Sequence, residues 1–216
     1  MRQLQQSSAV LKGKWIRRNS LAKIGHRLSL STSSANAIVT LLAAAAAYAS
    51  IISAPGTIGF LAAGLAIVML AIAVIDWRTF TIPDWLNISG AILGIAYAGA
   101  REPDAMLEAT AMAVLRGTVL ALIFFALRYG YAKWRGRQGL GLGDVKLAFV
   151  AGAWLDWLTI PLAIQLAAFA ALSVYLVRQL VSGQSMSATN RMPFGLFLAP
   201  AIWISWLLEV RWLDGF

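Results

Sequence analysis

The 216-residue sequence contains no cysteine and one histidine. The absence of cysteine excludes disulfides, thiolate zinc sites and cysteine nucleophiles. The histidine, His26, lies in a basic stretch without an acidic neighbour, so a histidine-based metal site or a Ser-His-Asp triad is not expected. We therefore predict that the protein uses no metal and no cofactor.

Charge is scarce as well. Only 12% of the residues are charged, 60% are hydrophobic, and the mean hydropathy is +0.73. A soluble domain of this size does not need so much apolar surface, whereas a polytopic membrane protein does. The nine tryptophans agree with this interpretation, because tryptophan concentrates at membrane interfaces.

The few charges are distributed unevenly. Seven of the 18 Lys and Arg residues lie at or before Arg27, with no acidic residue among them. This distribution indicates membrane topology and attraction to anionic lipid, and the segment lacks a recognised nucleic-acid motif. We expect residues 1–35 to form a basic cytoplasmic segment, residues 36–216 to form the transmembrane domain, and no nucleic acid to bind.

Apolar runs predict an all-α, polytopic integral membrane protein with about seven transmembrane helices in one bundle. Each run approaches the length that crosses about 30 Å of hydrocarbon. Basic residues cluster between alternate runs, which places the N-terminus in the cytoplasm. The predicted spans are 37–54, 57–75, 85–100, 106–127, a fifth from the glycine stretch to 157, 159–177 and 194–210.

Two carboxylates lie at boundaries of these spans. Asp144 follows three glycines at alternate positions in 139–147, and Asp76 ends the second span. The topology puts both on the cytoplasmic side at similar depth. Two carboxylates a few ångströms apart share a proton, so one can activate water while the other polarises a carbonyl. We predict that Asp76 and Asp144 form a catalytic pair.

Simpler roles compete with this prediction. Asp144 could be a helix N-cap, and Asp76 could pair with Arg78. We interpret Asp84 as a helix cap. Lys146 could reach the membrane interface, Asp76 or a substrate carboxylate.

Arg116 lies near the middle of the fourth span and needs a partner. Glu108 is about two helical turns earlier on the same face, so we expect it to pair with Arg116 or a water-filled groove to lie there.

Several short motifs together carry a family resemblance. Asp76-x5-Ile-Pro83-Asp, Gly141-Leu-Gly143-Asp-Val-Lys-Leu and Arg-Met-Pro193-Phe-Gly195 resemble the type IV prepilin peptidases, which are membrane aspartic proteases of the GxGD class. The resemblance covers about 75–200.

The resemblance implies that Asp76 and Asp144 are catalytic and that Gly141 and Gly143 shape the backbone beside them. Pro83, Lys146, Pro193 and Gly195 match the remaining motif positions, and we expect them to bind the substrate or to shape the site. The implied substrate is a pilin or pseudopilin precursor. The resemblance implies that the precursor is cut behind its basic leader, just before its hydrophobic helix, at the cytoplasmic face of the bacterial inner membrane.

The chain resembles the compact peptidases of tight-adherence (Flp) pilus systems. It lacks the Cys-x-x-Cys zinc ligands of bifunctional members, so methyltransferase activity is not predicted. Two alternatives stay open: a signal-peptide-peptidase-like GxGD protease, and a membrane transporter or pilus assembly factor with the aspartates as a polar pathway.

Overall fold

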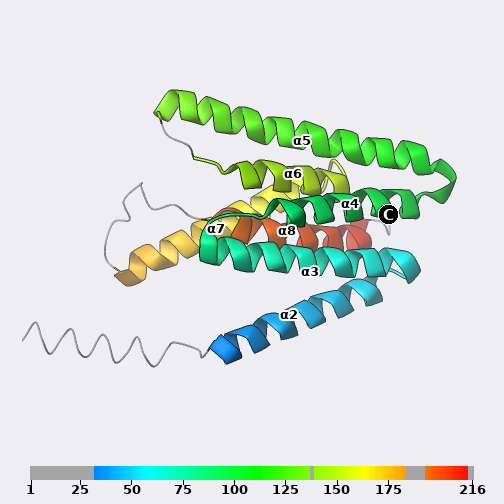
Figure 1. Cartoon of the computed structure of the whole chain (residues 1–216), viewed down its shortest axis with the longest axis horizontal. Helices are drawn as coiled ribbons and strands as arrows, with labels where there is room; N and C mark the ends of the chain where they lie inside the picture. The colour runs from blue at the N-terminus through cyan, green and yellow to red at the C-terminus, as the bar shows by residue number, and fades with distance from the viewer. Residues whose placement is uncertain (1–31, 137–138, 183–192, 214–216) are drawn as a thin grey trace, which may run out of the picture. The chain divides into compact units, whose positions relative to one another are not determined.

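A computed structural model describes residues 32–136, 139–182 and 193–213. All regular secondary structure in these ranges is helical, which confirms the predicted all-α class (Figure 1). A helix lies at each of the seven predicted spans. The α-helices are α2 (Thr32–Ser53), α3 (Gly56–Thr79), α4 (Asp84–Arg101), α5 (Met106–Arg135), α6 (Leu142–Trp154), α7 (Ile160–Ser182) and α8 (Gly195–Leu208), with a 3₁₀ turn η1 (Pro103–Ala105) and a π turn η2 (Glu209–Leu213).

Four helical segments are long and apolar enough to cross a membrane: Ser34–Ser53, Gly56–Thr79, Pro103–Arg135 and Ile160–Val181. The protein is therefore a membrane protein. Helices α6 and α8, with 13 and 14 residues, are shorter than the ~20 residues that span hydrocarbon. The described ranges thus contain seven α-helices, and four helical segments in them have the length and composition of full membrane spans.

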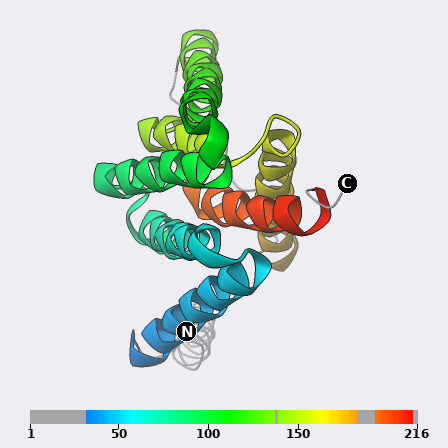
Figure 2. The ribbon, with the colours of Figure 1, turned by 90° about the vertical axis from the view of Figure 1, so that its right-hand side faces the viewer.

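The chain divides into two compact units, Met1–Leu42 and Ala43–Phe216. The boundary falls inside α2, and helices α3 to α8 all belong to the second unit. There α5 packs on α6, and α4 packs on α3, α5 and α6. Helix α8 packs on α3, α6 and α7, so the two shortest helices lie inside the bundle (Figure 2).

Helices α5 and α6 approach each other through two glycines. A Cβ atom on Gly152 would lie 2.6 Å from the backbone oxygen of Arg116, and one on Gly117 would lie 2.8 Å from the backbone oxygen of Phe149. Such distances are too short for a side chain, so only glycine permits this contact between backbones.

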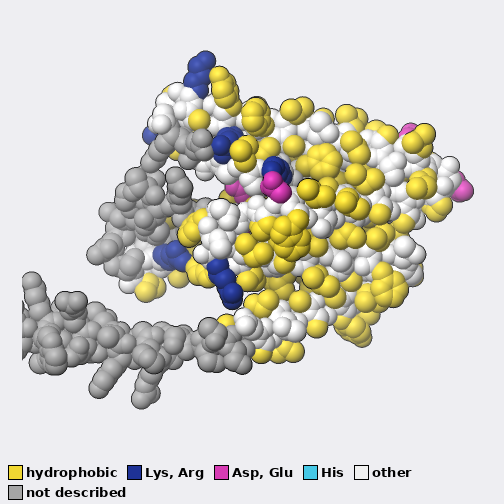
Figure 3. Space-filling view, in the orientation of Figure 1, with side chains coloured by type: hydrophobic (Ala, Val, Ile, Leu, Met, Phe, Trp, Pro, Cys, Tyr) yellow, Lys and Arg dark blue, Asp and Glu magenta, His cyan; other side chains and the backbone are white. Residues whose placement is uncertain are grey.

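Helices α3, α5 and α7 end at the same end of the bundle at which α4, α6 and α8 begin (Figure 1). We call this the site end. Figure 3 shows Lys and Arg side chains gathered toward it. The basic residues in the last turns of α3 and α5 contribute to this charge: Arg78, Lys133 and Arg135.

The opposite end carries a charged cluster that corrects one prediction. Arg116 lies 3.2 Å from the Asp156 carboxylate and donates a hydrogen bond to the backbone oxygen of Gly152. The predicted partner of Arg116, Glu108, was therefore wrong. The sequence spacing favoured a partner on α5 itself, but the carboxylate that pairs with Arg116 belongs to Asp156, in the loop after α6. Helix α6 packs beside α5 and so brings this loop to Arg116.

Candidate active site

Asp76 lies in the last turns of α3 with 4% of its surface exposed. The sequence predicted that the second span would end at Ile75, but the helix continues to Thr79. Phe80 then adopts a left-handed conformation (φ 54°), and its N–H donates to the backbone oxygen of Asp76. The carboxylate is thus held on a formed helix rather than in a loop.

The start of α8 supplies the contacts of the Asp76 carboxylate. The N–H of Leu196 donates to Asp76 Oδ2 at 2.9 Å. A Cβ on Gly195 would lie 2.8 Å from the same oxygen, so glycine lets the backbone approach this closely. The free N–H groups at a helix start favour negative charge. The described contacts of Asp76 are therefore with α8, not with Arg78.

Asp144 lies at the start of α6 with 8% of its surface exposed. Its Oδ2 accepts a hydrogen bond from the N–H of Gly141 at 3.1 Å. The N-cap residue is Gly141 and Asp144 is the third residue of the helix, so the N-cap alternative for Asp144 was wrong in position. Its carboxylate nevertheless makes one of the two hydrogen bonds of a capping box, because it accepts from the N–H of the N-cap residue.

Ile82 joins the two aspartate neighbourhoods. A Cβ on Gly195 would lie 2.6 Å from Ile82 Cδ1, and one on Gly143 would lie 3.0 Å from Ile82 Cβ. The starts of α6 and α8 therefore meet the linker 80–83 at one place. Gly195 lies against the Asp76 carboxylate and Gly143 directly precedes Asp144, so Ile82 contacts the glycine beside each aspartate. Residues 68 positions apart in sequence thus come together at the site end.

The two prolines of the motifs lie at helix starts. Pro83 is the N-cap residue of α4, and its oxygen accepts from the N–H groups of Leu86 and Asn87. Pro193 is half-buried and comes two residues before α8. The residues before it in the motif, 191–192, lie outside the described residues.

Asp84 and Lys146 pair with each other. Lys146 Nζ donates to Asp84 Oδ1 at 2.6 Å, and both side chains are about half exposed or more. Asp84 is the first residue of α4 and makes no side-chain cap, so its interpretation as a cap was wrong. Lys146 was predicted to reach the membrane interface, Asp76 or a substrate. Its observed partner is Asp84, because α4 and α6 start side by side.

Sequence reasoning missed the N–H group of Leu196, which contacts a carboxylate 120 positions away. A backbone donor has no sequence signature of its own. The available signal was the Pro-Phe-Gly element before the last apolar run, whose glycine permits the contact.

Chemically, the arrangement offers two buried carboxylates at one end of a largely apolar bundle, each held by a backbone N–H. Among the described residues, no group of three or more His, Cys, Asp and Glu side chains could hold a metal ion. A pair that shares one proton can act as general base and general acid in turn.

Comparison with known proteins identifies the family of the chain. Residues 62–176 match the model of the type IV leader peptidase family. The leader peptidase HopD of Salmonella typhimurium is 35% identical over 136 residues, which is 63% of this chain and 84% of HopD. HopD of Escherichia coli is 35% identical over 58% of this chain and 78% of that protein.

A longer relative extends the similarity. The prepilin leader peptidase/N-methyltransferase of Pseudomonas putida is 34% identical over 68% of this chain and 47% of its own length. No solved structure matches the chain significantly. On the family match and the similarity to HopD, the chain belongs to the type IV leader peptidase family and is a membrane-bound peptidase.

Proposed function

We propose that the protein cleaves the leader peptide from type IV prepilin or pseudopilin precursors, with Asp76 and Asp144 as its catalytic pair. The observation that carries the proposal is the placement of two buried carboxylates, from α3 and α6, around Ile82, which contacts both the glycine that lies against Asp76 and the glycine that precedes Asp144. The relatives named as leader peptidases and prepilin leader peptidases support the substrate class.

The mechanism follows from the shared proton. The ionised carboxylate takes a proton from a water molecule as that water attacks the scissile carbonyl. The protonated carboxylic acid donates a hydrogen bond to the carbonyl oxygen and then supplies the proton that the leaving amine requires. No covalent intermediate is needed. The N–H groups of Leu196 and Gly141 hold the two carboxylates in position while the proton moves between them.

The membrane side follows from charge. Basic residues in described segments lie at the site end, including Arg78, Lys133 and Arg135. Cytoplasmic loops of membrane proteins carry an excess of Lys and Arg, so the site end faces the cytoplasm of a bacterial inner membrane in this proposal. From its seven basic residues alone, we propose that the segment 1–35 also lies in the cytoplasm.

The test is cleavage of a co-expressed pilin precursor, followed as a gel shift. Asp76→Asn and Asp144→Asn should each lower cleavage about 10²- to 10⁴-fold, because each removes one member of a general acid–base pair. The double variant should be no worse than either single variant, since two groups that share one proton act as a unit.

Asp84→Asn is the matched control, because Asp84 is an exposed aspartate that pairs with Lys146 at the same end of the bundle. It should keep cleavage near the wild-type rate. If either Asp76→Asn or Asp144→Asn processed the precursor fully while remaining inserted in the membrane, the two-carboxylate mechanism would be abandoned.

A further inference from the structure

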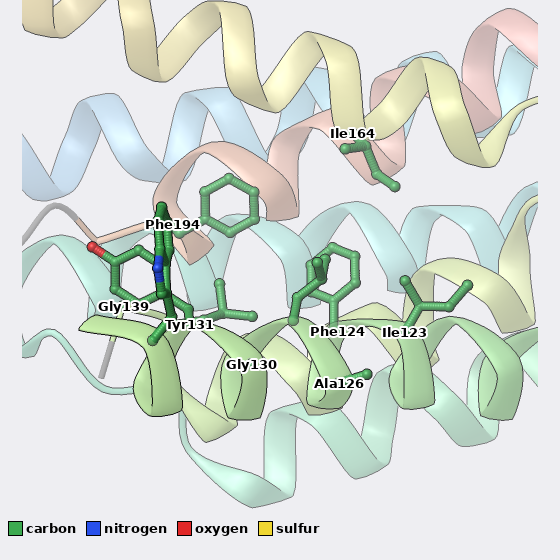
Figure 4. Close-up of a pocket in the computed structure, with 11 residues that line it drawn as sticks. Ile123, Phe124, Ala126, Gly130, Tyr131, Gly139, Ile164 and Phe194 are labelled. Atoms are coloured by element: carbon green, nitrogen blue, oxygen red, sulfur yellow. The ribbon is translucent and has the colours of Figure 1, made fainter. Parts of the chain in front are cut away.

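An apolar groove of about 810 Å³ runs beside the candidate active site. Figure 4 shows its two walls: Ile123 and Phe124 project from α5, while Ile164 of α7 and Phe194, which precedes α8, face them from the other side. All eleven lining residues are aliphatic, aromatic or glycine, and none is charged.

The groove continues into the site. Leu140 lines it and is the neighbour of Gly141, whose N–H binds Asp144. Phe194 also lines it and is the neighbour of Gly195, which lies against Asp76. Each of the two backbone segments that hold a carboxylate therefore also forms one boundary of the groove. A chain lying in the groove at this end would have its next residues beside both carboxylates.

The α5 wall has room for a further side chain at Gly130. A Cβ on Gly130 would meet nothing within 4 Å, and Gly130 is exposed. The lining residues of α5 run from Ile123 to Trp134, which is about 17 Å along a helix axis. A wall of this length fits one face of about three helical turns.

We propose that this groove binds the hydrophobic helix of the precursor, on the side of the cut that is retained, and so delivers the scissile bond to Asp76 and Asp144. This proposal rests on the proposed function. A hydrophobic helix already in the bilayer reaches the groove laterally between α5 and α7, and its side chains fill the space at each i and i+4 position. Binding at this remote surface positions the peptide bond for attack.

A peptide helix is favoured over the other apolar occupants by the position of the groove. A lipid chain would fill apolar volume anywhere on the bundle, and a second copy of the chain would need no access to the carboxylates. This groove instead ends between the two segments that hold them, Leu140–Gly141 and Phe194–Gly195. That continuity is what a substrate needs, because its hydrophobic helix and its scissile bond belong to one chain.

The sequence makes a sharp test possible, because the chain has no cysteine. Gly130→Cys places a single thiol in the groove. Ala111→Cys is the matched control: it is a small, exposed residue on the same helix, about 28 Å away along the axis. Both are combined with Asp144→Asn to trap the precursor, and precursors carry one cysteine at successive positions of the hydrophobic segment. Disulfide formation in membranes is then read on a gel.

The expected result is a crosslink from Gly130→Cys to precursor positions spaced three or four residues apart, with no crosslink from Ala111→Cys. Equal yields from both variants, or none from Gly130→Cys, would overturn the proposal. Crosslinks between two copies of the enzyme through position 130 would overturn it in favour of self-association.

A second measurement uses the same position, Gly130. Gly130→Leu adds a side chain where space is open and favours the helix, so the fold should be kept. It should raise the KM for the full precursor about tenfold, a loss of about 1.4 kcal/mol of binding, while Ala111→Leu leaves it unchanged. An unchanged KM for Gly130→Leu would contradict the groove. Failure of the proposed function is distinct from both results, because the wild-type enzyme would then not cut the precursor at all.

Discussion

The contact between Gly195 and Asp76 allows the positioning of one carboxylate to be tested by a single methyl group. In Gly195→Ala the new Cβ would lie 2.8 Å from Asp76 Oδ2, whereas ordinary contacts begin near 3.4 Å. The carboxylate oxygen must therefore retreat by about 0.6 Å (3.4 minus 2.8). That retreat also weakens the 2.9 Å hydrogen bond from Leu196.

The expected loss follows from the size of this shift. A misplacement of about 1 Å in an active site can lower the rate about 10²-fold, so we expect Gly195→Ala to lower kcat by about 10- to 100-fold. The fold should survive, because alanine is a better helix former than glycine at the start of α8. Initial rates of precursor cleavage by the purified enzyme and its Tm are the two measurements.

A double variant separates the two contacts that the new methyl group makes. Ile82→Val removes the Cδ1 atom that would lie 2.6 Å from this Cβ, but leaves Asp76 in place. Gly195→Ala combined with Ile82→Val should therefore remain slow. Gly64→Ala is the control, because its Cβ would meet only the mobile end of Leu93 at 3.2 Å. Recovery of full activity in the double variant would show that the loss of rate does not come from displacement of the Asp76 carboxylate.

Two further outcomes test the scaffold. Lys146→Gln should lower the free energy of unfolding by less than about 1 kcal/mol, because the ion pair of Lys146 with Asp84 is about half exposed. Cleavage of the precursor, measured by gel shift, should be nearly unchanged. A large loss of cleavage would place Lys146 in the site. Gly152→Ala should destabilise the protein by about 1–3 kcal/mol or prevent its folding, because the methyl group would clash with the backbone of Arg116 and Gly117. A variant with the wild-type Tm would contradict the close packing of α5 on α6.

The sequence by itself determined where the helices lie and which carboxylates to suspect. Apolar runs are local, so the bounds of α2 to α8 follow the predicted spans within a few residues in most cases. The largest difference is the C-terminus of α5, which continues through basic residues to Arg135 because helix formation does not require an apolar chain. The missing cysteines excluded whole classes of chemistry before any fold was known.

Only the tertiary structure decided which groups meet. The bond from Leu196 to Asp76, the pairing of Lys146 with Asp84 and that of Arg116 with Asp156 each join different segments. Hydrophobic periodicity is the same for every arrangement of the helices around one another, so it carries no information about these partners. The groove along α5 is likewise a property of how α5, α7 and the start of α8 are placed, and no single segment encodes it.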